Sequence, residues 1–151
     1  MSYLLDTNAC IAIINGRPRA VRVRLHEVLR RGEDVGVSAI ALFELWYGVA
    51  RSARIDANTE RFAVFLAPLD TLPLTDDDAR AAGTIRAELE RAGTPIGAYD
   101  TLIAGQALQR GLILVTANVA EFQRVGGLRW ENWAARAPGL TYPPRAKGGD
   151  G

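Results

Sequence analysis

The run Leu112-Ile113-Leu114-Val115-Thr116 is the feature that most restricts the fold of this chain. Its first four residues are apolar, so both faces of the segment need cover, as in a central strand of a parallel sheet. Parallel neighbours are joined by long crossover connections, which are usually helices. The run therefore predicts an α/β protein with helices on both faces of a parallel sheet.

Segments of the same kind supply the other elements. Four further short runs predict strands, at 3–5, 35–37, 69–74 and 128–130. Helical periodicity, capping residues and closing turns predict the helices between them, at 8–14, 21–29, after Ser38, at 58–66, at 76–91 and through Asp100 to Arg110. Residues 1–133 are expected to form one domain. Residues 134–151 turn to Pro, Gly and charge, which predicts a poorly ordered tail.

Composition excludes several classes of protein. Apolar residues make up 48% of the 151 residues and charged residues 23%, as in an ordinary globular domain. No apolar stretch approaches the length that spans a bilayer, so no membrane partner is expected. The N-terminus lacks the basic region and cleavage site of a signal peptide, which predicts a cytoplasmic protein. Cys10 is the single cysteine, which excludes a disulfide framework and a thiolate zinc site.

Three carboxylates lie in apolar surroundings. Asp6 follows the first strand, Glu44 interrupts an apolar helical run, and Asp100 begins another. Burying an ionised carboxylate is costly unless it is paired or binds a metal, and a shared divalent cation is the simplest explanation. Ligands of parallel sheets bind at the carboxyl ends of strands, where Asp6 and Asn118 are expected. The pattern predicts one acidic cleft.

Other charged segments have simpler explanations. Asp76, Asp77 and Asp78 follow Thr75, which predicts a capped helix start rather than a metal site. Six arginines between positions 17 and 31 predict either a solvated helix face or a phosphate-binding face. His26 is the only histidine, which excludes catalysis by a pair of histidines acting as acid and base. Catalysis by this chain is therefore expected to use a metal.

Motifs in a fixed order carry a resemblance to a known family. They are Leu4-Leu5-Asp6-Thr7-Asn8, Phe43-Glu44-Leu45 with Gly48, Pro95-Ile96-Gly97 with Asp100 and Ile103-Ala104, Val115-Thr116-Ala117-Asn118 with Glu121-Phe122, Gly127-Leu128, and Asn132-Trp133. Each motif is weak alone, but the series resembles the PIN-domain family over residues 3–133. Within it, the series resembles the VapC-type toxins of bacterial type II toxin–antitoxin pairs.

The resemblance implies a five-stranded parallel sheet and a Mg²⁺- or Mn²⁺-dependent endoribonuclease that cuts structured RNA such as tRNA. It also implies a cognate antitoxin and a homodimer. By position, the implied catalytic residues are Asp6, Glu44, Asp100 and Asn118. Of these, the first three are the implied metal ligands, with Asp6 and Asp100 expected to bind directly. The implied supporting residues are Thr7, Asn8, Thr116 and Glu121, and Arg86 is a candidate for contact with RNA or for bracing a carboxylate.

Two other functions compete with this one. Asn118 stands where PIN nucleases often have Asp, although Asn is common in VapC-type chains. It raises the question of one or two metals, and it suggests a catalytically weak PIN-like module that binds RNA or protein. A phosphoryl-handling domain with an acidic pocket needs a lysine near the site, yet the only lysine is Lys147, in the predicted tail.

The aromatic side chains around Glu44 and in the next predicted helix bear on a partner. They are Trp46, Tyr47, Phe62 and Phe65. Two short helices need less aromatic surface than this for their own packing, so we expect a groove for an amphipathic helix of a partner.

Overall fold

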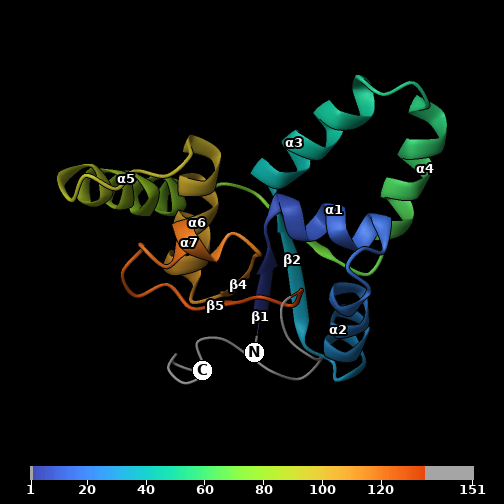
Figure 1. Cartoon of the computed structure of the whole chain (residues 1–151), viewed down its shortest axis with the longest axis horizontal. Coiled ribbons are helices and arrows are strands. Elements are labelled where there is room, and N and C mark those ends of the chain that lie inside the picture. The colour runs from blue at the N-terminus through green and yellow to red at the C-terminus, as the bar shows by residue number, and fades with distance from the viewer. Residues whose placement is uncertain (1, 135–151) are drawn as a thin grey trace.

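Strands and helices alternate through residues 2–134, the part of the chain that the computed structural model describes (Figure 1). Within it, the strands are β1 (Ser2–Leu5), β2 (Asp34–Ser38), β3 (Asp70–Leu72), β4 (Ile113–Val115) and β5 (Trp130–Glu131). The helices are α1 (Thr7–Asn15), α2 (Arg19–Arg30), α3 (Ala39–Ala50), α4 (Ile55–Leu66), α5 (Asp76–Arg91), α6 (Ala98–Arg110) and α7 (Val119–Phe122). None of these helices is long and apolar enough to cross a membrane.

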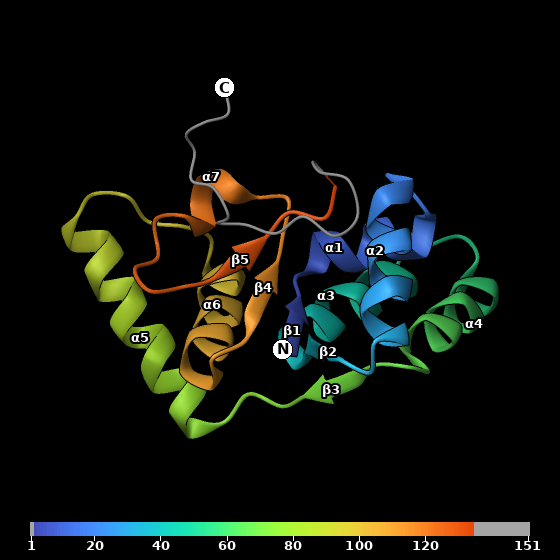
Figure 2. The same ribbon diagram turned by 90° about the horizontal axis from the view of Figure 1, so that it is seen from below.

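The five strands form one parallel sheet in the order β3-β2-β1-β4-β5. β1 lies between β2 and β4, and Leu5 is opposite Val37 on one side and Val115 on the other. The chain builds outward from β1 in one direction and then, after β3, in the other. Right-handed crossovers therefore place α1–α4 on one face and α5 and α6 on the other, as Figures 1 and 2 show. The predicted α/β fold with five parallel strands is confirmed.

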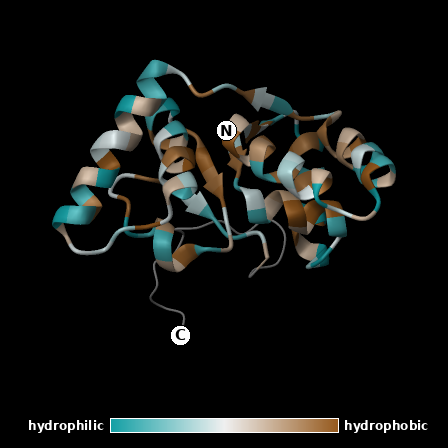
Figure 3. Ribbon diagram, turned by 90° about the horizontal axis from the view of Figure 1, so that it is seen from above, coloured by the Kyte–Doolittle hydropathy of each residue, from teal (hydrophilic) through white to brown (hydrophobic). Residues whose placement is uncertain are grey.

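The core lies on both faces of the central strands. Leu4, Leu5 and Leu114 are fully buried within the sheet, and Val37 and Phe122 are buried beside them. The hydrophobic colour runs along the central strands in Figure 3. Burial of a side chain of this size contributes about 1.5–3 kcal/mol, so these strands hold the ends from which the site residues project.

Capping residues set the starts of the helices as the sequence predicts. Ser38 accepts a hydrogen bond from the backbone N–H of Ile40 at the start of α3. Thr75 and Asp78 form a reciprocal capping box at the start of α5. The buried Asp78 carboxylate also accepts a hydrogen bond from Arg110 at 2.7 Å. The acidic segment at the start of α5 is thus an N-terminal cap.

Some boundaries differ from the prediction. β3 ends at Leu72 because Pro73, which follows, has no N–H to donate to a ladder. β5 lies at 130–131 rather than 128–130, since pairing with β4 begins where the carbonyl of Arg129 accepts from Leu114. α7 was not predicted. Of the predicted tail, 134–151, all but Ala134 lies outside the described residues.

The prediction for Arg24 is wrong. Arg24 is not on a solvated or phosphate-binding face: it is buried, 2.8 Å from Glu27 and 3.7 Å from Glu131. Phe62 and Phe65 are buried and stack on one another, and each lines a hollow beside α4. Helix α4 turns these rings inward, and Trp46 and Tyr47 of the predicted partner surface remain exposed.

Candidate functional site

Asp6 lies at the carboxyl end of β1, beside the end of β4 where the strand order reverses. Its backbone N–H donates to the carbonyl of Val115 at 3.1 Å, which continues the β1–β4 pairing by one residue. Its side chain caps α1 by accepting from the backbone N–H of Ala9 at 2.8 Å. The carboxylate is only 2% exposed. A parallel sheet binds ligands at this kind of position.

The loop after β4 brings two more predicted residues to Asp6. Thr116 is buried, accepts from the backbone N–H of Asn118 at 2.9 Å, and hydrogen-bonds through its side chain to the Asp6 carboxylate. Asn118 begins the short helix α7 and hydrogen-bonds to Asp100. The polar end of β4 therefore connects the carboxylates of Asp6 and Asp100.

Glu44 approaches the same place from α3. Its Oε1 accepts a hydrogen bond from the hydroxyl of Thr7 at 2.5 Å. Thr7 is the first residue of α1, directly after Asp6. The bond fixes one oxygen of the Glu44 carboxylate beside the start of α1, and the second oxygen, Oε2, takes no part in it.

The charges of these carboxylates act on one another. Burial, together with the negative charges of Asp100 and Glu44, raises the pKa of Asp6 to about 6. Burial also raises the pKa of Asp100, and the charges of Glu121 and Glu44 act in the same direction. The neighbouring carboxylates therefore repel one another, and a bound cation would reduce this repulsion.

The predicted metal ligands fit Mg²⁺ or Mn²⁺ by donor type and by charge. All of them are oxygen donors, which hard divalent cations prefer, and burial beside other carboxylates raises the pKa values of Asp6 and Asp100. Within residues 2–134, no group of three or more His, Cys, Asp or Glu side chains is arranged so that it could hold a metal ion. Mg²⁺ keeps several waters and needs only one or two carboxylates, so the fit does not require such a group.

Two predicted residues lie apart from the carboxylates. Asn8 is exposed and borders a separate small hollow with Thr116, Asn132 and Trp133. Arg86 lies on α5, where its Nε donates to Oε2 of Glu90 at 3.1 Å. The structure therefore brings Asp6, Thr7, Glu44, Asp100, Thr116, Asn118 and Glu121 together, whereas Asn8 and Arg86 each border another hollow.

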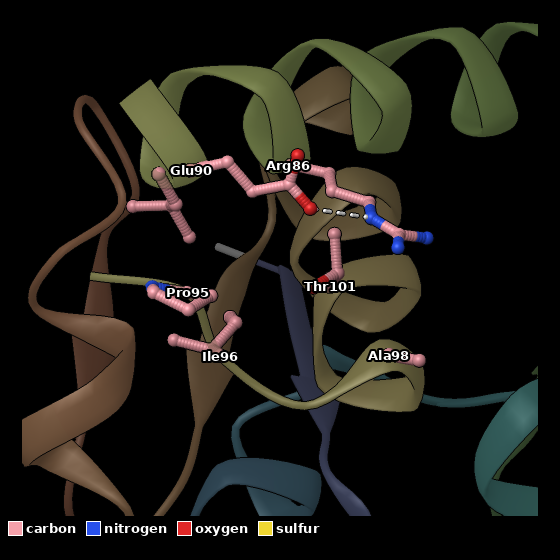
Figure 4. Close-up of a pocket in the computed structure, with 7 residues that line it drawn as sticks. Arg86, Glu90, Pro95, Ile96, Ala98 and Thr101 are labelled. Carbon is pink, nitrogen blue, oxygen red and sulfur yellow. Dashed lines mark hydrogen bonds and ion pairs between the residues drawn. The ribbon is translucent and has the colours of Figure 1, made fainter. Parts of the chain in front are cut away.

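Arg86 borders a pocket between α5 and the start of α6, with a volume of about 180 Å³ (Figure 4). The Arg86–Glu90 pair lies on one side, and Pro95 and Ile96 of the connecting loop lie on the other. Thr101, the next residue after Asp100, forms part of the wall. The pocket is thus one residue away from the acidic cleft along α6.

The fold and the site agree with one family. The model of the PIN domain matches residues 3–128 of the chain. This chain belongs to the PIN-domain family. Among its PIN-domain relatives, the tRNA(fMet)-specific endonuclease VapC of Shigella flexneri is 44% identical over 137 residues, which cover 89% of this chain and 99% of that protein. The protein of the same name from Salmonella typhimurium is 41% identical over 133 residues, covering 88% of this chain and 98% of the relative.

Solved structures of PIN-domain relatives share the architecture. VapBC2 of Rickettsia felis, bound to a DNA fragment from its promoter, matches with a TM-score of 0.83 at 37% identity, covering 88% of this chain and 99% of that one. DNA-bound VapBC from Salmonella typhimurium matches with a TM-score of 0.81 at 41% identity, covering 88% of this chain and 98% of that one. The predicted resemblance to VapC-type PIN-domain proteins is confirmed.

Proposed function

We propose that this protein is the toxin of a toxin–antitoxin pair, an endoribonuclease that uses Mg²⁺ or Mn²⁺ to hydrolyse structured RNA. The observation that carries the proposal is the convergence of Asp6, Glu44 and Asp100 at the point of the sheet where the strand order reverses. Relatives at 41–44% identity over nearly their whole length are endonucleases specific for tRNA(fMet), which makes a tRNA the first substrate to try.

In this proposal, Asp6 and Asp100 hold the ion and Glu44 contributes through water. A bound divalent ion supplies charge neutralisation at the phosphoryl group and lowers the pKa of water. Glu44 keeps Oε2 available to orient the attacking water, because the hydroxyl of Thr7 holds Oε1. Thr116 and Asn118 orient the carboxylates of Asp6 and Asp100. Glu121 adds a further carboxylate beside Asp100.

Attack by water predicts the chemistry of the ends. The products carry 5′-phosphate and 3′-hydroxyl groups, because the ribose 2′-hydroxyl takes no part in the displacement. Asn118 brings no charge, so one tightly held ion is expected rather than two. End analysis of the fragments by ligation and mass spectrometry tests the first point, and 2′,3′-cyclic phosphate ends would contradict it.

This protein has a groove in which a helix of the antitoxin can bind. Two adjoining hollows of about 330 and 440 Å³ lie among α1, α2, α3 and α4, and both include Ile14 and Arg61. Glu44 borders the first of them, so a helix in the groove reaches the acidic cleft. Relatives in the VapBC family are toxin–antitoxin complexes. We infer that an amphipathic helix of the antitoxin lies here and blocks access to Glu44.

One substitution separates inhibition from catalysis. Val64 lines the groove and is 75% exposed, so Val64→Glu changes the groove without opening the core. We expect this variant to cleave RNA like the wild type and to resist inhibition by the antitoxin, measured by titration into a cleavage assay. If the antitoxin inhibited Val64→Glu at the same concentration as the wild type, its binding site would lie outside this groove.

The test of the enzyme itself is cleavage of purified tRNA(fMet) and of total RNA by antitoxin-free protein in Mg²⁺ or Mn²⁺. Discrete fragments are expected, and they disappear with EDTA and with Asp100→Asn. Equal cleavage by the variant would indicate a contaminating nuclease or a different site. No cleavage by folded protein would favour the second candidate, a PIN-like module that binds RNA or protein. The uncharged side chain of Asn118 supports that candidate.

The proposal also covers the setting of the reaction. We place the protein in the cytoplasm, where its RNA and antitoxin are made, and the single, buried Cys10 has no need of an oxidising compartment. We expect a homodimer, which light scattering of the antitoxin-free protein measures directly. A monomer at micromolar concentration would contradict this part of the proposal alone.

A further inference from the structure

Two aromatic residues stand next to the site carboxylates in the chain. Phe43 precedes Glu44 on α3, and Tyr99 precedes Asp100 on α6. Their rings meet across the two helices, with centroids 5.5 Å apart and planes at 72°. The sequence considerations above did not single out Tyr99, although its position directly before Asp100 was the available signal. The aromatic pair therefore lies where α3 and α6 meet, each ring next in sequence to a site carboxylate.

Packing of the protein core does not account for this pair. Phe43 is 54% exposed and Tyr99 is 47% exposed, so each ring keeps much of its surface in water. In an edge-to-face contact, the edge of one ring covers one face of the other, and the remaining faces stay open. The Phe43–Tyr99 pair is thus an apolar surface in which each ring supports the other and leaves ring faces available to a ligand.

We propose that the Phe43–Tyr99 pair stacks on an unpaired nucleobase next to the phosphodiester that is cut. This inference rests on the proposed ribonuclease activity and adds the feature of the RNA that the site recognises. Nucleobases stack on exposed aromatic rings whatever their sequence, and enzymes that act on RNA bind unpaired bases in this way. The proposal therefore predicts cleavage in a single-stranded part of a structured RNA.

The charge of the cleft favours a base as the ligand of these rings. The carboxylates of Asp6, Glu44, Asp100 and Glu121 repel the RNA backbone, and one divalent ion offsets their charge only in part, so the strand gains little from Coulomb attraction at this point. An uncharged contact close to the cleft supplies binding without adding to the repulsion. Successive residues of a helix point about 100° apart, so a ring beside a carboxylate can hold a base while the carboxylate faces its phosphate.

The test uses the full-length, antitoxin-free protein and tRNA(fMet) that carries an abasic nucleotide. The cut is first mapped in the intact tRNA, and each of the two nucleotides that flank it is then replaced by an abasic one. For the wild type, one abasic position is expected to lower kcat/KM about tenfold. Tyr99→Leu is expected to lower kcat/KM on the intact tRNA to the same degree, with little further loss at that abasic position.

Matched variants separate stacking from a structural role. Tyr99→Phe keeps the ring and should keep the sensitivity to the abasic position, and Phe43→Leu should behave like Tyr99→Leu. Ile55→Ala removes an equally exposed apolar side chain on α4 and should leave both kcat/KM and the abasic effect unchanged. Circular dichroism confirms that each variant is folded.

The outcomes are distinct. Equal abasic losses in the wild type and in Tyr99→Leu would overturn the stacking inference and leave the ribonuclease proposal intact. A change of oligomeric state in Tyr99→Leu with parallel losses on both RNAs would also overturn it, and would assign the rings to a protein interface. No cleavage by the wild type would remove the ribonuclease proposal and this inference with it.

Discussion

The hydroxyl of Thr7 donates a hydrogen bond to Oε1 of Glu44 at 2.5 Å, which joins the first residue of α1 to the middle of α3. The contact links the carboxyl end of β1, where Asp6 lies, to the element that carries the next carboxylate. A charged acceptor makes such a bond shorter and stronger than a neutral pair. Thr7 therefore positions Glu44, and the start of α1 holds the side chains of both Asp6 and Glu44.

Loss of that hydroxyl should reduce turnover. Thr7→Val has nearly the same shape, so the fold should persist while Glu44 loses its fixed orientation. We expect kcat to fall about tenfold with little change in KM, because a misplaced catalytic group affects the reaction more than binding. Steady-state kinetics on tRNA(fMet) measure this, and Thr7→Ser should restore most of the rate. An unchanged kcat in Thr7→Val would remove the positioning role.

The buried Asp6 should make the metal-free protein less stable as the pH rises. Burial raises the pKa of Asp6 from its usual 3.8 to about 6, so between these values the folded state binds more protons than the unfolded state. Stability then falls with rising pH over that window. Asp6→Asn stays neutral and still caps α1, so above pH 7 it should exceed the wild type by about 2–3 kcal/mol, with near equality below pH 4.

Urea unfolding in EDTA at several pH values measures this difference. Addition of Mg²⁺ at pH 7.5 should raise the unfolding midpoint of the wild type and leave that of Asp6→Asn nearly unchanged, because a ligand stabilises only the state that binds it. An equal rise in both proteins would place the ion away from Asp6. A pH-independent difference between them would mean that the Asp6 carboxylate titrates normally.

Residues near the strand ends were the easiest to predict. Asp6 follows β1 directly and Asn118 follows β4 by three residues, and the carboxyl ends of parallel strands meet at one edge, so their proximity follows from local sequence. Thr75 and Asp78 lie three residues apart and form the capping box that such spacing predicts. In both cases the deciding interactions are local or follow from strand direction alone.

Residues whose partners lie far along the chain could not be predicted. Arg24 fits a solvated helix face by composition, but it pairs with Glu131 of β5, and Trp133 donates its indole N–H to the same carboxylate at 2.7 Å. Only the three-dimensional fold brings α2 to β5. The Phe43–Tyr99 contact is of the same type, since nothing local to α3 indicates that α6 lies beside it.

Arg86 should strengthen RNA binding through its charge. Its side chain is 68% exposed and pairs with Glu90, and such surface pairs are weak, so the guanidinium is easily released to a phosphate. Arg86→Ala should raise KM several-fold with kcat nearly unchanged, and should lower the salt dependence of binding by about one unit of slope. Glu90→Gln should lower KM. Steady-state kinetics measure the KM values of the two variants, and fluorescence anisotropy with labelled tRNA(fMet) at several salt concentrations measures the slope. An unchanged slope in Arg86→Ala would exclude a phosphate contact.

Gly105 should be essential to the packing of α6 against α5. A Cβ at Gly105 would lie 2.7 Å from the Cβ of Ala82 and 2.8 Å from its backbone N, which is too close for either helix to accommodate without moving. We expect Gly105→Ala to destabilise the protein by about 1–3 kcal/mol, despite the higher helix propensity of Ala. Because α6 also carries Tyr99 and Asp100, its displacement should reduce RNA cleavage as well.

Gly83 provides the matched control on α5. A Cβ there meets nothing within 4 Å, so Gly83→Ala should gain about 0.5–1 kcal/mol from helix propensity alone. Urea unfolding of both variants and the wild type measures the two effects. If Gly105→Ala were as stable as the wild type and equally active, α5 would have moved away from α6 without disturbing the site carboxylates. The close approach of the two helices would then have no part in holding Asp100 in place.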